Sequence, residues 1–103
     1  MHLVQLLLPL YDNERRRQPE ELFRRVRTEL TERFGGLTEH TRAPARGLWQ
    51  DDDTGRTRQD EIVVFEVMVD AIDHDWWRAY RAALEAAFRQ KELVMRAQEI
   101  ELL

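Results

Sequence analysis

The 103-residue sequence has no cysteine, only three prolines and four glycines, and no long apolar run. The absence of cysteine excludes disulfides, thiolate metal ligands and cysteine nucleophiles. It also fits a reducing compartment, so we expect a cytoplasmic protein. The first residues lack the basic segment and the small-residue cleavage site of a signal peptide. No apolar run approaches the roughly 20 residues of a membrane-spanning helix, so we expect no membrane partner.

Lysine is also nearly absent. Fifteen of the 16 basic residues are arginine, and Lys91 is the only lysine. The formal net charge of −4 disfavours binding to a phosphate backbone. We therefore expect no nucleic-acid partner. The arginine bias fits the recognition of small anions, and it fits equally well a solvated, arginine-rich surface.

Two short apolar segments are the strongest structural signal. Seven of the eight residues in Ile62–Val69 are apolar, and Glu66 is the exception. A strand with one solvated face should alternate between apolar and polar residues, so this segment predicts a central strand covered on both faces. Leu3 to Leu10 has the same character and predicts a second central strand.

The remaining segments complete a repeated strand–helix–strand order. Helical stripes predict helices near residues 19–34 and 74–90. Leu37 to Gln50 predicts a strand in which Pro44 indicates an edge position or a bulge. Asp51 to Asp60 predicts a polar loop, and Leu93 to Leu102 predicts the last strand. We therefore expect a single α+β domain over 1–103 with a ferredoxin-like (βαββαβ) antiparallel sheet, strand order 4-1-3-2, and both helices on one face.

Several short segments carry a resemblance to a known family. They are Leu7-Leu8-Pro9-Leu10-Tyr11, Phe34-Gly35-Gly36-Leu37-Thr38, Arg46-Gly47-Leu48-Trp49 and Phe88-Arg89-Gln90. With these segments the chain resembles a family of small uncharacterised bacterial ferredoxin-like α+β proteins, a domain of unknown function. The resemblance implies a small α+β domain over nearly the whole chain. It implies no activity and assigns no functional residue.

One face of the predicted sheet is too apolar for water. Alternation places the helices over Val63, Phe65, Val67 and Val69. The opposite face would carry Ile62, Val64, Glu66, Met68, Leu3, Gln5 and Leu7, joined by Arg96, Gln98, His40 and Arg42 from the edge strands. A large exposed apolar patch on a small protein usually binds a partner. We expect a homo-oligomer, most simply a dimer, formed through this face or through an edge strand.

Glu66 is the strongest single candidate for a site residue, because a charged carboxylate in a central strand is costly to bury without a partner. As a functional residue it would be a general base or a ligand anchor. As a structural residue it would make a hydrogen bond or an ion pair with Gln5, Arg42 or Arg96. The sequence leaves both roles open.

A second set of candidates surrounds the predicted edge strand. The arginines could bind the carboxylate or phosphate of a small anionic ligand through bidentate contacts, or they could simply solvate the edge. This set contains His40, Arg42, Arg46, Trp49 and Tyr11, with Gln5 and Arg96 as further ligand-binding candidates. Asp70, Asp73, His74 and Asp75 could ligate a metal, but helix capping explains the aspartates, and we expect no metal.

No phosphate-binding loop, nucleophile elbow or zinc-ligand spacing occurs, so we expect no cofactor. The sequence favours a non-catalytic, homo-oligomeric interaction or small-ligand-binding module. The alternative is a small cofactor-independent enzyme of the dimeric α+β barrel type, in which Glu66 or His40 is the acid/base.

Overall fold

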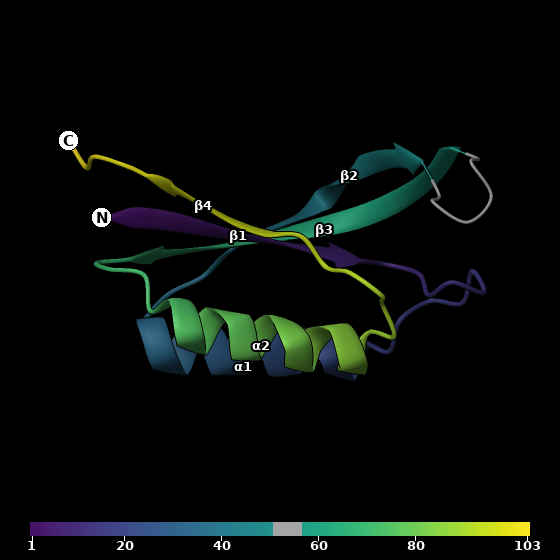
Figure 1. Cartoon of the computed structure of the whole chain (residues 1–103), viewed down its shortest axis with the longest axis horizontal. Helices are drawn as coiled ribbons and strands as arrows, with labels where there is room; N and C mark the ends of the chain where they lie inside the picture. The colour runs from purple at the N-terminus through teal and green to yellow at the C-terminus, as the bar shows by residue number, and fades with distance from the viewer. Residues whose placement is uncertain (51–56) are drawn as a thin grey trace.

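The chain forms two layers, a four-stranded antiparallel sheet and a pair of helices on one of its faces (Figure 1). The computed structural model describes the backbone of residues 1–50 and 57–103, and the side chains of residues 1–40 and 61–103. The elements are β1 (His2–Pro9), α1 (Glu20–Phe34), β2 (Thr38–Gln50), β3 (Thr57–Val69), α2 (His74–Ala87) and β4 (Met95–Glu99). The strand order is β2-β3-β1-β4, which confirms the predicted ferredoxin-like sheet.

The two apolar segments are the central strands, and their alternating side chains divide the sheet into two different faces. β1 and β3 are antiparallel, with His2 opposite Val69 and Pro9 opposite Ile62. Side chains on the helix-facing side are buried: Val4, Leu6, Leu8, Val63, Phe65, Val67 and Val69. The predicted assignment of faces is therefore confirmed, and this side of the sheet forms the core with the helices.

Helix α1 buries Phe23, Val26 and Leu30 against this core. It ends at Gly35, whose φ of 81° is left-handed and whose N–H donates to the carbonyl of Thr31. Glycine suits this position because it has no Cβ to clash.

Helix α2 begins where the Asp73 carboxylate accepts a 3.1 Å hydrogen bond from the Trp76 N–H, a side-chain cap that satisfies one open donor of the helix end. Its buried residues are Trp77, Tyr80 and Leu84. In the described part of the chain, neither helix is long and apolar enough to cross a bilayer.

The predicted bounds of three elements were wrong by two residues or more. β3 begins at Thr57, so residues 57–60 are strand and not loop. In this hairpin Gln50 lies opposite Thr57, because backbone pairing does not depend on the polarity of the side chains. Residues 51–56 lie outside the described residues. β4 runs only from Met95 to Glu99, which lies opposite His2 at the start of the adjacent strand. One further hydrogen bond, from the N–H of Ile100 to the carbonyl of Met1, follows it. α2 ends at Ala87, and two residues later Arg89, in the left-handed conformation (φ 55°), turns the chain.

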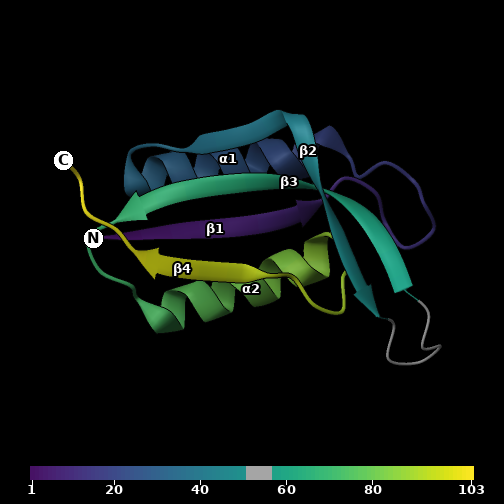
Figure 2. The same ribbon diagram turned by 90° about the horizontal axis from the view of Figure 1, so that it is seen from above.

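β2 is an edge strand with an irregularity at the expected place. Its register against β3 shifts between His40 and Ala45, the interval that contains Pro44. Proline cannot donate to a sheet ladder, which accounts for the break. Seen from above in Figure 2, β2 lies outside β3, and the β2–β3 hairpin extends past the end of β1.

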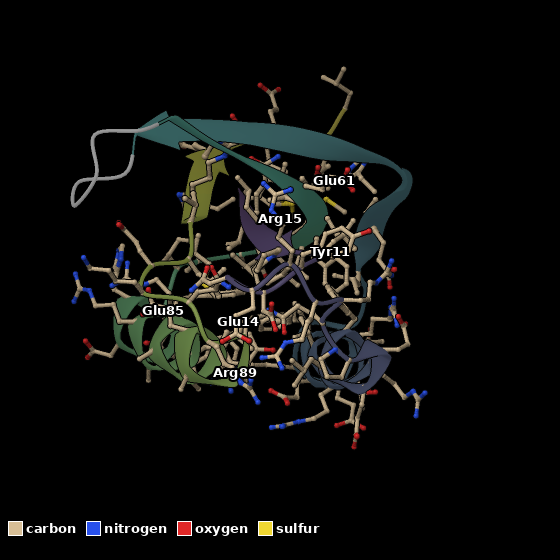
Figure 3. The ribbon with its side chains drawn as sticks, turned by 90° about the vertical axis from the view of Figure 1, so that its right-hand side faces the viewer. Tyr11, Glu14, Arg15, Glu61, Glu85 and Arg89 are labelled. Carbon is tan, nitrogen blue, oxygen red and sulfur yellow. The ribbon has the colours of Figure 1, made fainter. Side chains whose placement is uncertain are left out.

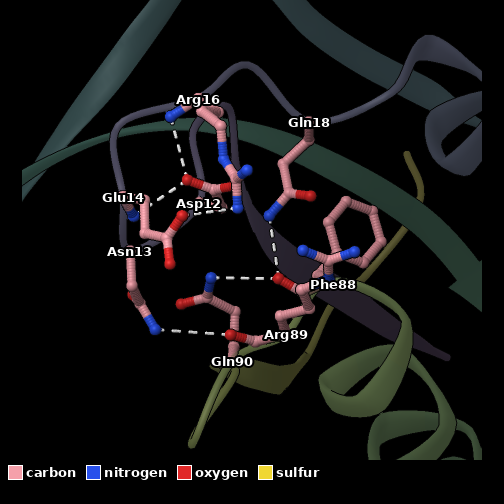
Figure 4. A network of polar contacts seen from close by, with 8 residues as sticks. All are labelled: Asp12, Asn13, Glu14, Arg16, Gln18, Phe88, Arg89 and Gln90. Carbon is pink, nitrogen blue, oxygen red and sulfur yellow. Dashed lines mark hydrogen bonds and ion pairs between the residues drawn. The ribbon is translucent and has the colours of Figure 1, made fainter.

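A polar network fixes the end of the molecule where α1 begins and α2 ends (Figure 4). The carboxylate of Asp12 accepts hydrogen bonds from the backbone N–H groups of Glu14 and Arg16, at 2.9 and 2.8 Å. Gln18, which is only 4% exposed, donates from Nε2 to the carbonyl of Phe88 at 2.8 Å. The connection between β1 and α1 is thereby attached to the C-terminal end of α2.

Candidate functional site

A row of four polar side chains crosses the open face of the sheet, the face opposite the helices. His40 lies on β2, Glu66 on β3, Gln5 on β1 and Arg96 on β4, so every strand contributes one residue. Gln5 lies directly opposite both Glu66 and Arg96 in the strand register. His40 is diagonal to Glu66, because its direct partner is Val64. A diagonal neighbour is within reach of a long or aromatic side chain.

Three hydrogen bonds join this row from end to end. His40 Nε2 lies 2.7 Å from Glu66 Oε1. Gln5 Nε2 donates to the same oxygen at 3.4 Å, and Arg96 Nε donates to Gln5 Oε1 at 2.8 Å. The expected partners Gln5 and Arg96 are thus present. They form a chain of hydrogen bonds, in which Gln5 lies between the Arg96 guanidinium and the Glu66 carboxylate.

The row is anionic in the middle and cationic at the β4 end. An ionised carboxylate only accepts hydrogen bonds, so with Glu66 ionised the hydrogen of this contact lies on Nε2 of His40. The Glu66 side chain is 19% exposed and that of His40 is 52% exposed. An imidazole and a carboxylate at this distance can exchange a proton or hold the charge of a bound group.

Apolar cross-strand pairs flank the row on both sides. Leu3 lies opposite Met68, and Leu7 lies opposite Val64. Met68 is 53% exposed, and the other three side chains are half-buried. No described element covers this face, as Figure 1 shows from the side. The face therefore combines a polar stripe with two apolar stripes.

Tyr11, another predicted site residue, does not join the row. It follows β1 by two residues and is six residues beyond Gln5, a separation of about 20 Å along an extended chain. Figure 3 shows it near Glu61, at the end of the molecule where α1 begins. Here it lines a cleft of about 370 Å³, together with Leu10, Arg17, Glu20, Phe23, Arg27, Glu61 and Val63.

Arg27 organises the charges in this cleft. Its guanidinium contacts Glu20 at 2.8 Å and Glu39 at 2.5 Å, and it lies 5.8 Å from the centre of the Phe65 ring. The hydrogen bond from Arg27 holds the pKa of Glu20 below its usual value. The same contact, followed by the one to Glu39, raises the pKa of Arg27. The arginine is therefore engaged within the fold, and Arg17 is the other cation in the cleft.

Except for Tyr11, these cleft residues were not predicted from the sequence. Glu20 and Arg27 are seven positions apart, which places them on one side of a helix two turns apart, and this spacing was the available signal. The sheet brings Glu61 to the cleft and Glu39 to Arg27, which local spacing does not indicate. The side chains of the predicted residues Arg42, Arg46 and Trp49 lie outside the described residues.

No family model and no curated protein matches the sequence, so the family resemblance stays a prediction. Solved structures do share the fold. A phage SAM lyase in complex with S-methyl-5'-thioadenosine matches with a TM-score of 0.67 and 13% identity, over 95% of this chain and 80% of that chain. Its apo state matches with a TM-score of 0.59 and 14% identity, over 94% and 78%. CutA of Pyrococcus horikoshii, solved in the presence of 3 M guanidine hydrochloride, matches with a TM-score of 0.56 and 14% identity, over 100% and 87%. At these identities the likeness establishes a small ferredoxin-like fold.

Proposed function

We propose that this chain is a homo-oligomeric, non-catalytic interaction and small-ligand-binding module, and that its open sheet face binds a second copy of the chain. One observation carries the proposal: the apolar pairs Leu3–Met68 and Leu7–Val64 flank a hydrogen-bonded polar row on a face that no described element covers. Burying such a face against a partner removes apolar surface from water.

The charge distribution of the row suits pairing of the face with itself. In a two-fold dimer, the same surface on both copies must be self-complementary. An axis along β1, between two stacked sheets, would place β4 of each copy over β3 of the other. Arg96 of each copy would then lie over Glu66 of the partner, and the apolar stripes would meet their own counterparts. Two sheets packed in this aligned way are separated by about 10 Å, a gap that an arginine side chain can span.

The native mass of the chain and of Met68→Glu tests the proposal. Met68 is 53% exposed in the single chain, so glutamate there should leave the fold intact. In the dimer it would bury a charge in an apolar stripe, which is costly. We expect a dimer for the unchanged chain and a monomer for the variant.

A second candidate function is a small cofactor-independent enzyme. The 2.7 Å contact between His40 and Glu66 favours it, because an acid/base pair needs this distance. The likeness of the fold to a SAM lyase bound to S-methyl-5'-thioadenosine supplies two probes. If the pair is catalytic, SAM or S-methyl-5'-thioadenosine should raise the melting temperature, and SAM should be turned over.

Glu66→Gln separates the two functions. The amide oxygen of the new side chain would still accept a hydrogen bond from His40 or Gln5, so the free energy of unfolding should change by about 1 kcal/mol or less. Turnover of SAM that this variant abolishes, without loss of stability, would establish the enzyme. The leading proposal predicts no turnover by either protein.

A further inference from the structure

A groove between the start of α2 and the edge strand β4 lies apart from the Tyr11 cleft and shares only Arg96 with the polar row. Its volume is about 240 Å³, the space of about eight water molecules at roughly 30 Å³ each. Figure 2 shows α2 beside β4 at this edge of the sheet. The residues that line the groove are Val4, Ile72, His74, Trp77, Arg78, Arg81, Met95, Arg96 and Ala97.

The lining divides into an apolar floor and a basic rim. Apolar residues of β1, α2, β4 and the segment before α2 form the floor, with Trp77 and Met95 as its largest side chains. His74, Arg78 and Arg81 form the rim, at the i, i+4, i+7 spacing that places three side chains on one stripe of a helix. Arg96 of β4 is the fourth basic residue of the lining, and its Nε already donates to Gln5 in the polar row. All three rim residues are exposed.

The rim has cationic charge available for a ligand. No carboxylate lines the groove, and none within the described residues pairs with Arg81. Arg78 lies 3.8 Å from Asp75, but both side chains are largely exposed, at 71% and 99%, so this pair is weak. The basic rim stands out because the whole chain carries a net charge of −4.

We infer that this groove binds a small amphipathic anion, of the class of medium-chain carboxylates. Its apolar chain would lie on Trp77 and Met95, and its carboxylate would accept hydrogen bonds from Arg78 and Arg81. Arginine forms bidentate contacts with a carboxylate, and ligand sites typically combine an apolar lining with a few placed polar groups. The inference rests on the small-ligand-binding part of the proposed function and locates it in the fold.

The test is calorimetric titration of the full chain with sodium octanoate, and with octylammonium chloride as the probe of opposite charge. Arg81→Gln should weaken octanoate binding by about tenfold or more, the effect of losing one charge-assisted hydrogen bond. Arg24→Gln is the matched control, because Arg24 is also an exposed helical arginine without an ion pair among the described residues. It should leave the affinity unchanged.

A second variant, Ala97→Leu, fills the groove and should prevent binding while the melting curve stays cooperative. The native mass of Arg81→Gln is measured in parallel and should equal that of the unchanged chain. A failure of the proposed self-association is then distinguished from a failure of ligand binding. The inference is overturned if octanoate does not bind at millimolar concentration or octylammonium binds equally well. It is also overturned if Arg24→Gln weakens binding as much as Arg81→Gln, or if Arg81→Gln lowers the native mass, because a protein partner would then occupy the groove.

Discussion

Gln18 shows how a single polar residue can connect two distant segments. It is the buried polar residue of the described part of the chain, and its amide reaches the carbonyl of Phe88, 70 positions away. That carbonyl also accepts a 3.1 Å hydrogen bond from Gln90. Asn13 donates to the neighbouring carbonyl of Arg89 at 3.4 Å. Figure 4 shows these contacts closing the end of α2 against the segment that leads into α1.

Gln18→Ala should lower the free energy of unfolding by about 1–2 kcal/mol, because it removes a buried hydrogen bond and leaves a small cavity. Urea denaturation followed by circular dichroism measures this change. Gln98→Ala is the control, since Gln98 is an exposed glutamine on β4, and it should have an effect within about 0.5 kcal/mol. Equal effects of the two variants would show that the buried contact contributes nothing.

The partners of Glu66 show what could and could not be predicted at the level of single residues. An isolated charge in an apolar strand predicted a partner, and the strand order predicted Gln5 and Arg96. The bond from His40 was not predicted, because it depends on the diagonal register of β2 before the shift at Pro44. Gln18 was not predicted either, since nothing local distinguishes a buried glutamine from a solvated one.

At the scale of elements, the ends of the helices depend on left-handed residues. Gly35 ends α1 with a φ of 81°, and Arg89 follows α2 with a φ of 55°. After α2 the N–H of Gln90 donates to the carbonyl of Glu85, and that of Arg89 to the carbonyl of Ala86. This is the bond pattern of a Schellman motif, and it explains why the second helix is shorter than its apolar stripe predicts.

Gly35→Ala should destabilise the protein by about 1 kcal/mol, because a side chain in the left-handed region is strained. The adjacent Gly36→Ala is a matched control. Gly36 does not have a positive φ, and a Cβ there would meet nothing within 4 Å. Thermal unfolding of both variants checks the prediction. A loss in Gly36→Ala as large as that in Gly35→Ala would contradict it.

The sequence pattern predicted the type and order of the strands and helices, and apolar periodicity predicted the buried faces of β1, β3, α1 and α2, since burial of an apolar face is what holds these elements in place. It failed at the strand ends. Thr57 to Asp60 pair through their backbone with β2, and their polar sequence carries no apolar signal. The end of β4 lies opposite the start of β1, which is information from a distant segment.

At the scale of the whole molecule, the two proposed binding surfaces differ in character. The open face of the sheet is self-complementary in charge and has apolar stripes, whereas the groove beside β4 has a basic rim. They share Arg96, but the other groove residues belong to α2, the segment before it and the helix-facing side of β1 and β4, so a dimer through the open face would leave most of the groove accessible. A stable interface usually takes about 800 Å² from each partner, roughly a tenth of the 7453 Å² that this chain exposes.

Light scattering with size exclusion, at micromolar concentration, decides whether the open sheet face joins two copies of the chain. We expect twice the 12.4 kDa of one chain for the unchanged protein. For Met68→Glu we expect a single-chain mass with a folded circular dichroism spectrum. Ala82→Glu is the control, because Ala82 is exposed on α2, on the opposite side of the molecule, and it should keep the doubled mass. A single-chain mass for the unchanged protein, or a doubled mass for Met68→Glu, would contradict the proposed interface.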